Sequence, residues 1–168
     1  MIQIDLLINS LPIELNKPYP KLIKSGKLKK VSFLLRKQMK LKEDESVYWV
    51  KNPSIDCFHS EFAMYPPIGV PNLRAEQMFG TSAYFYFNKK DVLIRISFQL
   101  IQNTFLAKNA LQLFRSICGK SYGVPKAYGD VNGFIKFTEW EDNDSELITE
   151  LSDSGKHFYI HWFLKQDS

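Results

Sequence analysis

Alternation of apolar and polar residues is the clearest pattern in the second half of the chain, and it predicts strands. Residues 92–101 alternate over their whole length, and a polar turn at 88–91 separates them from an aromatic run at 84–87. Two alternating runs joined by a short polar turn are typical of a β-hairpin. The same alternation predicts further strands at the following positions: 47–50, 134–140, 146–151 and 157–164.

One stretch has the spacing of a helix instead. Apolar residues recur every three or four positions from about 104 to 119, Asn103 or Thr104 can cap the start, and Gly123 and Pro125 follow the end. The residues of this apolar stripe are Leu106, Ala110, Leu113, Phe114 and Ile117. The second half therefore has the order β-β-α-β-β-β. It predicts an α+β fold, an antiparallel sheet with one main helix (about 104–119) packed on one face.

The first half is less regular. Alternation between Val31 and Leu41 favours a half-buried strand or hairpin, and a helix through Leu28, Val31, Leu35 and Met39 is the alternative. A helical turn at 21–25 is predicted to close at Gly26. Residues 52–80 are rich in proline and predict a long irregular loop, either a binding surface or the cover of a small satellite cluster.

Composition is that of one globular domain over residues 1–168, because 45% of the residues are hydrophobic and 24% are charged. No apolar run is long enough to cross a bilayer, so we expect no membrane insertion. The opening residues MIQIDLLINS lack the basic start of a secretory signal, which predicts a cytoplasmic protein. In that compartment Cys57 and Cys118 are expected to be reduced core thiols.

Charge is distributed unevenly, although the formal net charge is only +4. Residues 17–42 hold ten basic residues and no acid, whereas residues 139–153 hold seven acids and no base. The basic segment suits either an anionic ligand such as nucleic acid, or a solvated face whose lysines protect a sheet edge. The candidate anion-binding residues are Lys27, Lys29, Lys30, Arg36 and Lys37.

Motifs for catalysis or metal binding are not found in the sequence. His157 and His161 have the i, i+4 spacing of a helical zinc site, but their run HFYIHWFL alternates as a strand does. In a strand these positions are about 13 Å apart, at ~3.3 Å per residue, too far to share a metal ion. No acid lies in an apolar stretch that would raise its pKa for general acid catalysis. We therefore expect a binding protein without catalytic residues, metal or cofactor.

The stretch Leu113-Phe-Arg-Ser-Ile-Cys-Gly-Lys-Ser-Tyr-Gly-Val-Pro125, a helix that ends in a Tyr-Gly-x-Pro turn before the closing strands, resembles small bacterial immunity proteins. The resemblance extends over about the last 85 residues and includes the small size of the chain. It implies a non-catalytic protein that binds and neutralises a cognate toxin. Immunity proteins against nucleases tend to be strongly acidic, and this chain is net basic, so either a toxin of another kind or inhibition through the local acidic segment only fits better.

The acidic hairpin is the expected contact with such a toxin, because an aromatic beside complementary charge makes a binding hot spot. Its candidate residues are Glu139, Trp140, Glu141, Asp142, Asp144 and Glu146. The alternative for Trp140 is a core residue at a strand end. Two other functions stay open, a nucleic-acid-associated protein using residues 17–42 and a small ligand-binding or enzymatic domain with a pocket under residues 52–80. The sequence leaves the oligomeric state open.

Overall fold

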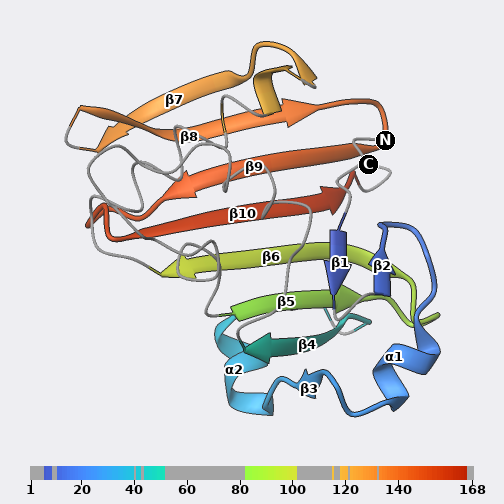
Figure 1. Cartoon of the computed structure of the whole chain (residues 1–168). Coiled ribbons are helices and arrows are strands. Elements are labelled where there is room, and N and C mark those ends of the chain that lie inside the picture. Colours follow the sequence, from blue (N-terminus) through green and yellow to red (C-terminus); the bar gives the residue numbers. More distant parts are fainter. Residues whose placement is uncertain are drawn as a thin grey trace, which may run out of the picture.

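A computed structural model of the chain describes residues 6–8, 11–39, 41–42, 44–51, 82–101, 115, 118–120, 122–131 and 133–165 (Figure 1). Its elements in chain order are β1 Leu6–Ile8, β2 Leu11–Ile13, α1 Pro20–Lys24, β3 Lys29–Lys30, α2 Phe33–Gln38, β4 Ser46–Lys51, β5 Ser82–Phe87, β6 Leu93–Ile101, β7 Lys126–Val131, β8 Phe134–Glu141, β9 Ser145–Leu151 and β10 His157–Leu164. None of the helices in this part of the chain is long and apolar enough to span a membrane.

Eight strands form one antiparallel sheet in the order β3-β4-β5-β6-β10-β9-β8-β7. Strands β3 to β6 make one half, and the consecutive strands β7 to β10 make the other (Figure 1). The halves meet where β6 pairs with β10, from Arg95 opposite Phe163 to Ile101 opposite His157. The separate β1–β2 hairpin is a second, two-stranded sheet.

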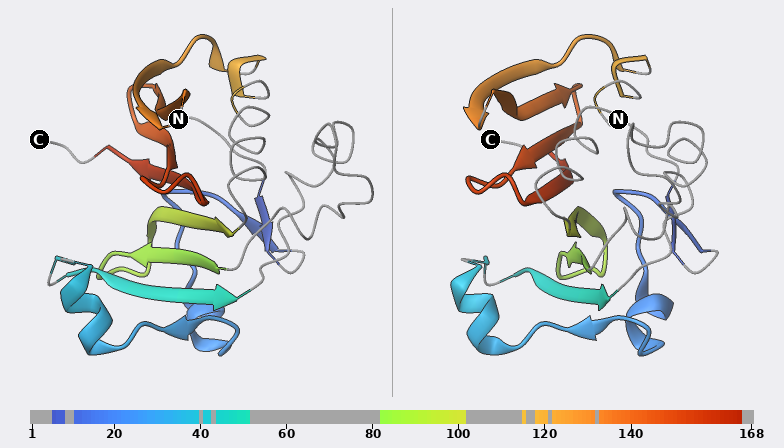
Figure 2. Two further views of the ribbon diagram at one scale, coloured as in Figure 1. Left: turned by 90° about the vertical axis from the view of Figure 1, so that its left-hand side faces the viewer. Right: turned by 60° about the vertical axis from the view of Figure 1, so that its left-hand side comes forward.

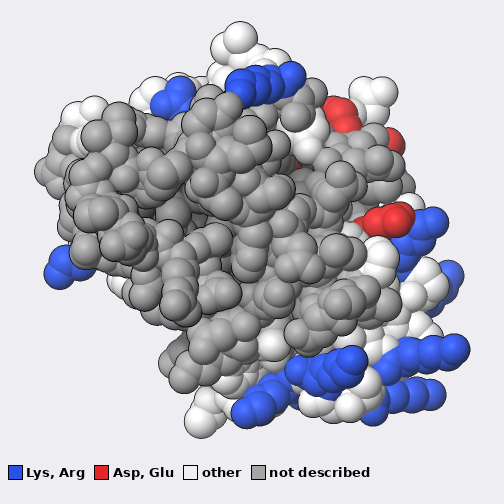
Figure 3. Space-filling model, in the orientation of Figure 1, with Lys and Arg blue, Asp and Glu red and all other residues white. Residues whose placement is uncertain are grey.

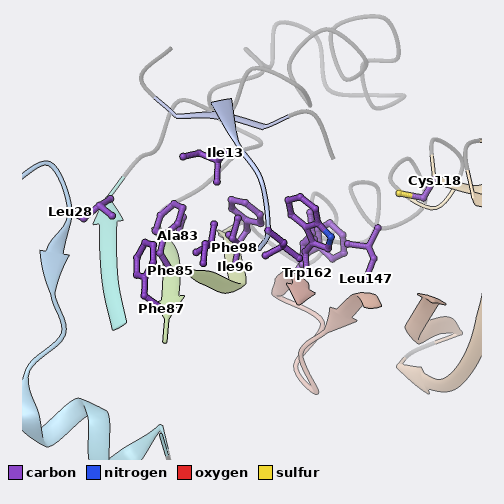
Figure 4. Packing of buried hydrophobic residues seen from close by; sticks show 14 of the residues in the cluster. Ile13, Leu28, Ala83, Phe85, Phe87, Ile96, Phe98, Cys118, Leu147 and Trp162 are labelled. Carbon is purple, nitrogen blue, oxygen red and sulfur yellow. The ribbon is translucent and has the colours of Figure 1, made fainter. Parts of the chain in front are cut away.

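The inner face of the sheet carries the main hydrophobic core. Alternate residues of the central strands point into it, so that Phe85, Phe98 and Trp162 are almost completely buried. Ile13 of β2 packs against this face (Figure 4), as do Leu15, which follows β2, and Leu22 of α1. Because successive side chains of a strand point to opposite faces, the large apolar residues lie together on one covered face of the sheet.

The outer face carries a second, smaller cluster. Its buried residues are Val31, Val47 and Tyr86, and Met39 and Leu41 pack against them. The segment around α2 therefore lies over the face opposite to the one that β2 covers, as Figure 2 shows.

The predicted fold class is confirmed, since the structure has one antiparallel sheet with short helices. Strand β10 has the predicted bounds, and β4, β5, β6, β8 and β9 differ from prediction by two residues at most. The helical turn near residue 21 is α1, and Gly26 follows it with φ +72°, the left-handed conformation that favours glycine.

The strand favoured between Val31 and Leu41 is wrong, because residues 33–38 form helix α2. The Ser32 hydroxyl caps this helix by accepting a hydrogen bond from the Leu35 amide, 3.4 Å away. Of the four residues of the alternative helix, Val31 and Met39 reach the outer cluster, whereas Leu28 belongs to the main core and Leu35 is exposed. A capped helix can bury the side chains of Val31 and Met39 and leave those between them in solvent.

Two further differences concern strands. Strand β7 was not predicted, so the described order of the second half has four strands after the helical stretch instead of three. Strand β7 contains Gly129 at φ +72°, and its residues 126–130 are exposed, so no apolar alternation marks it. The register between β5 and β6 shifts between Tyr86 and Phe87, which pair with Arg95 and Leu93. This irregularity places Leu93 in the core and Ile94 at the outer cluster, so the strict alternation of residues 92–101 does not hold at this end of β6.

Other predictions lie mostly outside the described residues. These are the irregular loop at 52–80, Cys57, and most of the helix at 104–119, of which residues 115 and 118–120 are described and helical. Cys118 is buried, and burial raises the pKa of its thiol to about 12. Cys118 is a free cysteine, and its predicted place in the core is confirmed.

The core predicts a double-mutant experiment at Thr138 and Thr149. These residues are completely buried opposite each other in β8 and β9, and their hydroxyls are hydrogen-bonded to each other. Thr138→Val or Thr149→Val alone leaves one buried hydroxyl without its partner, so each should cost about 1–3 kcal/mol of unfolding free energy. The double variant removes both hydroxyls and should recover most of that loss in urea unfolding. Additive losses would contradict a coupled pair.

Candidate partner-binding site

The outer face of the sheet is built from three rows of side chains that cross the strands. The middle row places Trp49, Tyr84, Ser97, His161 and Ile148 side by side in register. The row beside it, nearer to the start of β6, runs through the following residues: Val47, Tyr86, Arg95, Phe163, Glu146 and Glu141. The row on its other side contains Ser82, Gln99, Tyr159, Glu150, Phe137 and Tyr128.

Arg95 is at the centre of this face. Its guanidinium carbon lies 4.8 Å from the ring centroid of Tyr86 and 5.8 Å from that of Phe163, so the cation is held between two aromatic rings. Arg95 Nε donates to Ser97 Oγ at 3.1 Å, and Nη2 donates to His161 Nδ1 at 3.4 Å. The register of three strands, β5, β6 and β10, thus fixes the direction of the Arg95 side chain.

His161 is a neutral member of the same network. Arginine can only donate, so Nδ1 of His161 accepts and the ring proton is on Nε2. Ser97 Oγ lies 2.9 Å from the same Nδ1. Burial, and secondarily the charge of Arg95, lower the pKa of His161 from 6.5 to about 4. The 3.9 Å contact between Nε2 and Glu150 is therefore not an ion pair at neutral pH.

A groove opens beside Arg95, between the segment that follows α2 and the outer face of the sheet. Its volume is about 1100 Å³. Half of its lining is apolar or aromatic, contributed by Met39, Leu41, Tyr86, Ile94, Phe163 and Leu164. The other half is charged with both signs, contributed by Lys42, Glu45, Arg95, Glu141, Glu146 and Lys165.

Two of the predicted acidic contacts, Glu141 and Glu146, line this groove. Glu141 is hydrogen-bonded to Lys126 and, at 2.7 Å, to Lys165, and these bonds hold its pKa at about 2. Glu139 lies on the same side of β8, with its carboxylate 3.4 Å from Lys126 Nζ. The acids at this end of the sheet thus have basic neighbours in their own half of the molecule.

The other predicted acidic-hairpin residues lie elsewhere. Trp140 is only 3% exposed and its indole N–H donates to the Gly123 carbonyl at 3.0 Å, so it is a core residue and not a surface contact. Asp142 shapes the β8–β9 turn, because its Oδ1 accepts from the amides of Asp144 and Ser145 at 2.8 and 2.9 Å. Asp144 is exposed at the tip of that turn.

The structure divides the predicted basic patch between an edge and a helix. Lys29 and Lys30 form β3, the strand at the edge of the sheet, and both are exposed. Lys29 Nζ lies 5.6 Å from the Trp49 ring centroid. Arg36 and Lys37 belong to α2, and Arg36 Nη2 donates to the Glu45 carbonyl at 2.7 Å. Lys27 is exposed in the turn before β3. On the face shown in Figure 3, basic side chains gather around α1.

Sequence reasoning missed the residues at the centre of the site, which are Tyr86, Arg95 and Phe163. Alternation placed Arg95 on the polar side of its strand and Phe163 on the same face as His161. The missing information was that β6 pairs with β10, which brings Phe163 to the side of Arg95 opposite to the one where the β5–β6 register places Tyr86. His157 and His161 share a strand face as predicted, and the described residues contain no group of three or more metal-ligating side chains.

Searches against protein-family models, curated proteins and solved structures found no match to this chain.

The lowered pKa of His161 predicts a pH-dependent stability. The unfolded chain takes up the imidazole proton near pH 6.5, whereas the folded chain resists it until about pH 4. Stability should therefore fall as the pH is lowered through this window, by roughly 3 kcal/mol in total. His161→Gln removes the titrating group and should flatten the slope between pH 6.5 and 5, measured as the urea midpoint at each pH. The wild type and His161→Gln contain the same carboxylates, so equal slopes in the two proteins would refute His161 as the source of this pH dependence.

Proposed function

We propose that this chain is a non-catalytic protein-binding module whose partner is a cognate bacterial toxin, and that the groove beside Arg95 is its contact surface. The observation that carries the proposal is the placement of Arg95 between Tyr86 and Phe163 in the groove lining. Arginine and tyrosine are strongly enriched among the residues that dominate binding energy at protein interfaces.

The electrostatics of the groove also support a protein partner. Its acids, Glu141 and Glu146, and its bases, Lys42 and Lys165, line the same opening. Mixed charge around an apolar floor speeds encounter and fixes the orientation of a partner that carries the complementary pattern. Binding through a groove of mixed charge does not require the inhibitor to have a negative net charge. It is therefore compatible with a net charge of +4.

Rigidity is a further argument. Arg95 is held by two aromatic rings, a hydroxyl and an imidazole on neighbouring strands. A side chain that is already ordered loses little entropy when a partner binds. Tight binding through a limited surface is what neutralisation of a toxin requires.

Affinity capture tests the proposal. The tagged protein is incubated with lysate of its native cell, washed at high salt with nuclease, and its partners are identified by mass spectrometry. We expect one protein in stoichiometric amount. Phe163→Ala and Glu146→Lys should each weaken its binding by about 2 kcal/mol or more, roughly thirtyfold, in calorimetry with the purified partner. Co-expression should then suppress the partner's toxicity with the wild-type chain and not with these variants.

Matched controls lie outside the groove. Tyr128→Ala removes an aromatic ring of β7 that is 51% exposed, and Asp153→Lys reverses an acid in the β9–β10 turn. Both should bind like the wild type. A partner whose affinity is equally insensitive to all four variants would refute the groove as the contact surface. Recovery of nucleic acid alone, lost on salt and nuclease treatment, would refute the protein-binding function itself.

A further inference from the structure

Helix α2 presents two large apolar side chains to solvent. Phe33 is 79% exposed and Leu34 is 75% exposed, although both are large enough to belong in a core. Adjacent exposed side chains of this size mark an interaction surface. We propose that Phe33 and Leu34, with the lysines around them, dock the protein on an anionic phospholipid surface. This inference concerns a surface other than the groove and does not depend on the proposed function.

The fold holds these two side chains outward without their help. Helix α2 is anchored before Phe33 by Val31, which is buried in the outer cluster, and after it by Met39, which packs on that cluster. Arg36 also ties the helix to the Glu45 carbonyl. Because the anchoring residues are others, the exposure of Phe33 and Leu34 does not come from a frayed end. Their apolar surface stays available for an external contact.

The chain on both sides of Phe33 and Leu34, the apolar tip of α2, is rich in lysine. Lys30 is exposed in β3, three residues before Phe33, and Lys37 is exposed in the last turn of α2. The whole segment from residue 17 to 42 contains no acid. Apolar side chains with lysines before and after them in the chain complement a membrane interface, where aromatic and aliphatic side chains enter the headgroup layer and lysines meet the lipid phosphates.

The shape of the surface favours a lipid over a folded acidic partner. Phe33 and Leu34 protrude from a short helix, and the groove on the same side is lined by Met39 and later residues, not by these two. A protrusion suits a soft interface that needs no complementary pocket. Lysines outnumber arginines between residues 17 and 42. A lysine ammonium responds to a diffuse negative field as a point charge and does not form the bidentate contacts that arginine forms. Two apolar side chains make a reversible anchor, which does not cross the bilayer.

Co-sedimentation with vesicles tests the proposal on the full chain. Mixed phosphatidylserine–phosphatidylcholine vesicles should bind the protein at least about tenfold more strongly than pure phosphatidylcholine vesicles, and salt should weaken the binding. The double variant Phe33→Ser/Leu34→Ser should lose this binding. Lys30→Glu/Lys37→Glu should lose it independently. All four positions are exposed, so both variants should keep the unfolding midpoint of the wild type.

Two controls match these changes elsewhere on the surface. Val124→Ser removes an apolar side chain that is 97% exposed, and Lys89→Glu/Lys90→Glu reverses two exposed lysines in the β5–β6 turn. Both should bind vesicles like the wild type. Equal binding to both vesicle types, no binding to either, or equal loss in the controls would overturn the proposal. So would self-association in light scattering that disappears in Phe33→Ser/Leu34→Ser, since a second copy would then occupy the tip.

Discussion

The pairing of β6 with β10 is the contact on which the rest of the structure depends. It joins a half made of β3 to β6 to a half made of β7 to β10, and without it each half would have an additional open edge. One register aligns both faces at once, with Phe98 opposite Ile160 in the core and Ser97 opposite His161 on the outer face. A slip of one residue would exchange the two faces of β10, so burial of the core also determines the geometry of the polar network.

The hydrogen-bonded network of Arg95, Ser97 and His161 gives the outer face a fixed shape. His161 is neutral, its Nδ1 accepts from Arg95, and the Arg95 cation is already stacked on two rings. Groups that satisfy one another in this way present a constant shape to a partner, because few of them can rearrange without losing a hydrogen bond. The groove next to them adds charges of both signs at its opening. Recognition by shape, with charge for orientation, is the chemistry that such an arrangement serves best.

The alternation of apolar and polar residues was enough to predict most strands. It failed where contacts between distant segments decide the local structure. The aromatic alternation of β10 predicted its bounds, since every second residue is buried against the same face. The alternation between Val31 and Leu41 was misleading, because a capped helix also reaches the outer cluster with its two flanking residues. Strand β7 gives no apolar signal, because residues 126–130 lie exposed at a sheet edge. The groove could not be predicted, because its lining comes from segments that the β6–β10 pairing and the packing of the segment after α2 bring together. Glu141 and Glu146 were found through their charge alone.

The position of β10 in the sheet also has a consequence for biosynthesis. It is the last strand of the sheet to leave the ribosome, yet it occupies a central place between β6 and β9. The hairpin of β5 and β6 can form early from neighbouring residues, but the edge of β6 stays open until β10 has been synthesised. The chain therefore completes its core in one late, long-range step, and contacts of high sequence separation of this kind are slow to form. A nascent or shortened chain that ends before β10 would expose the apolar faces of both halves, and would depend on chaperones until the final strand arrives.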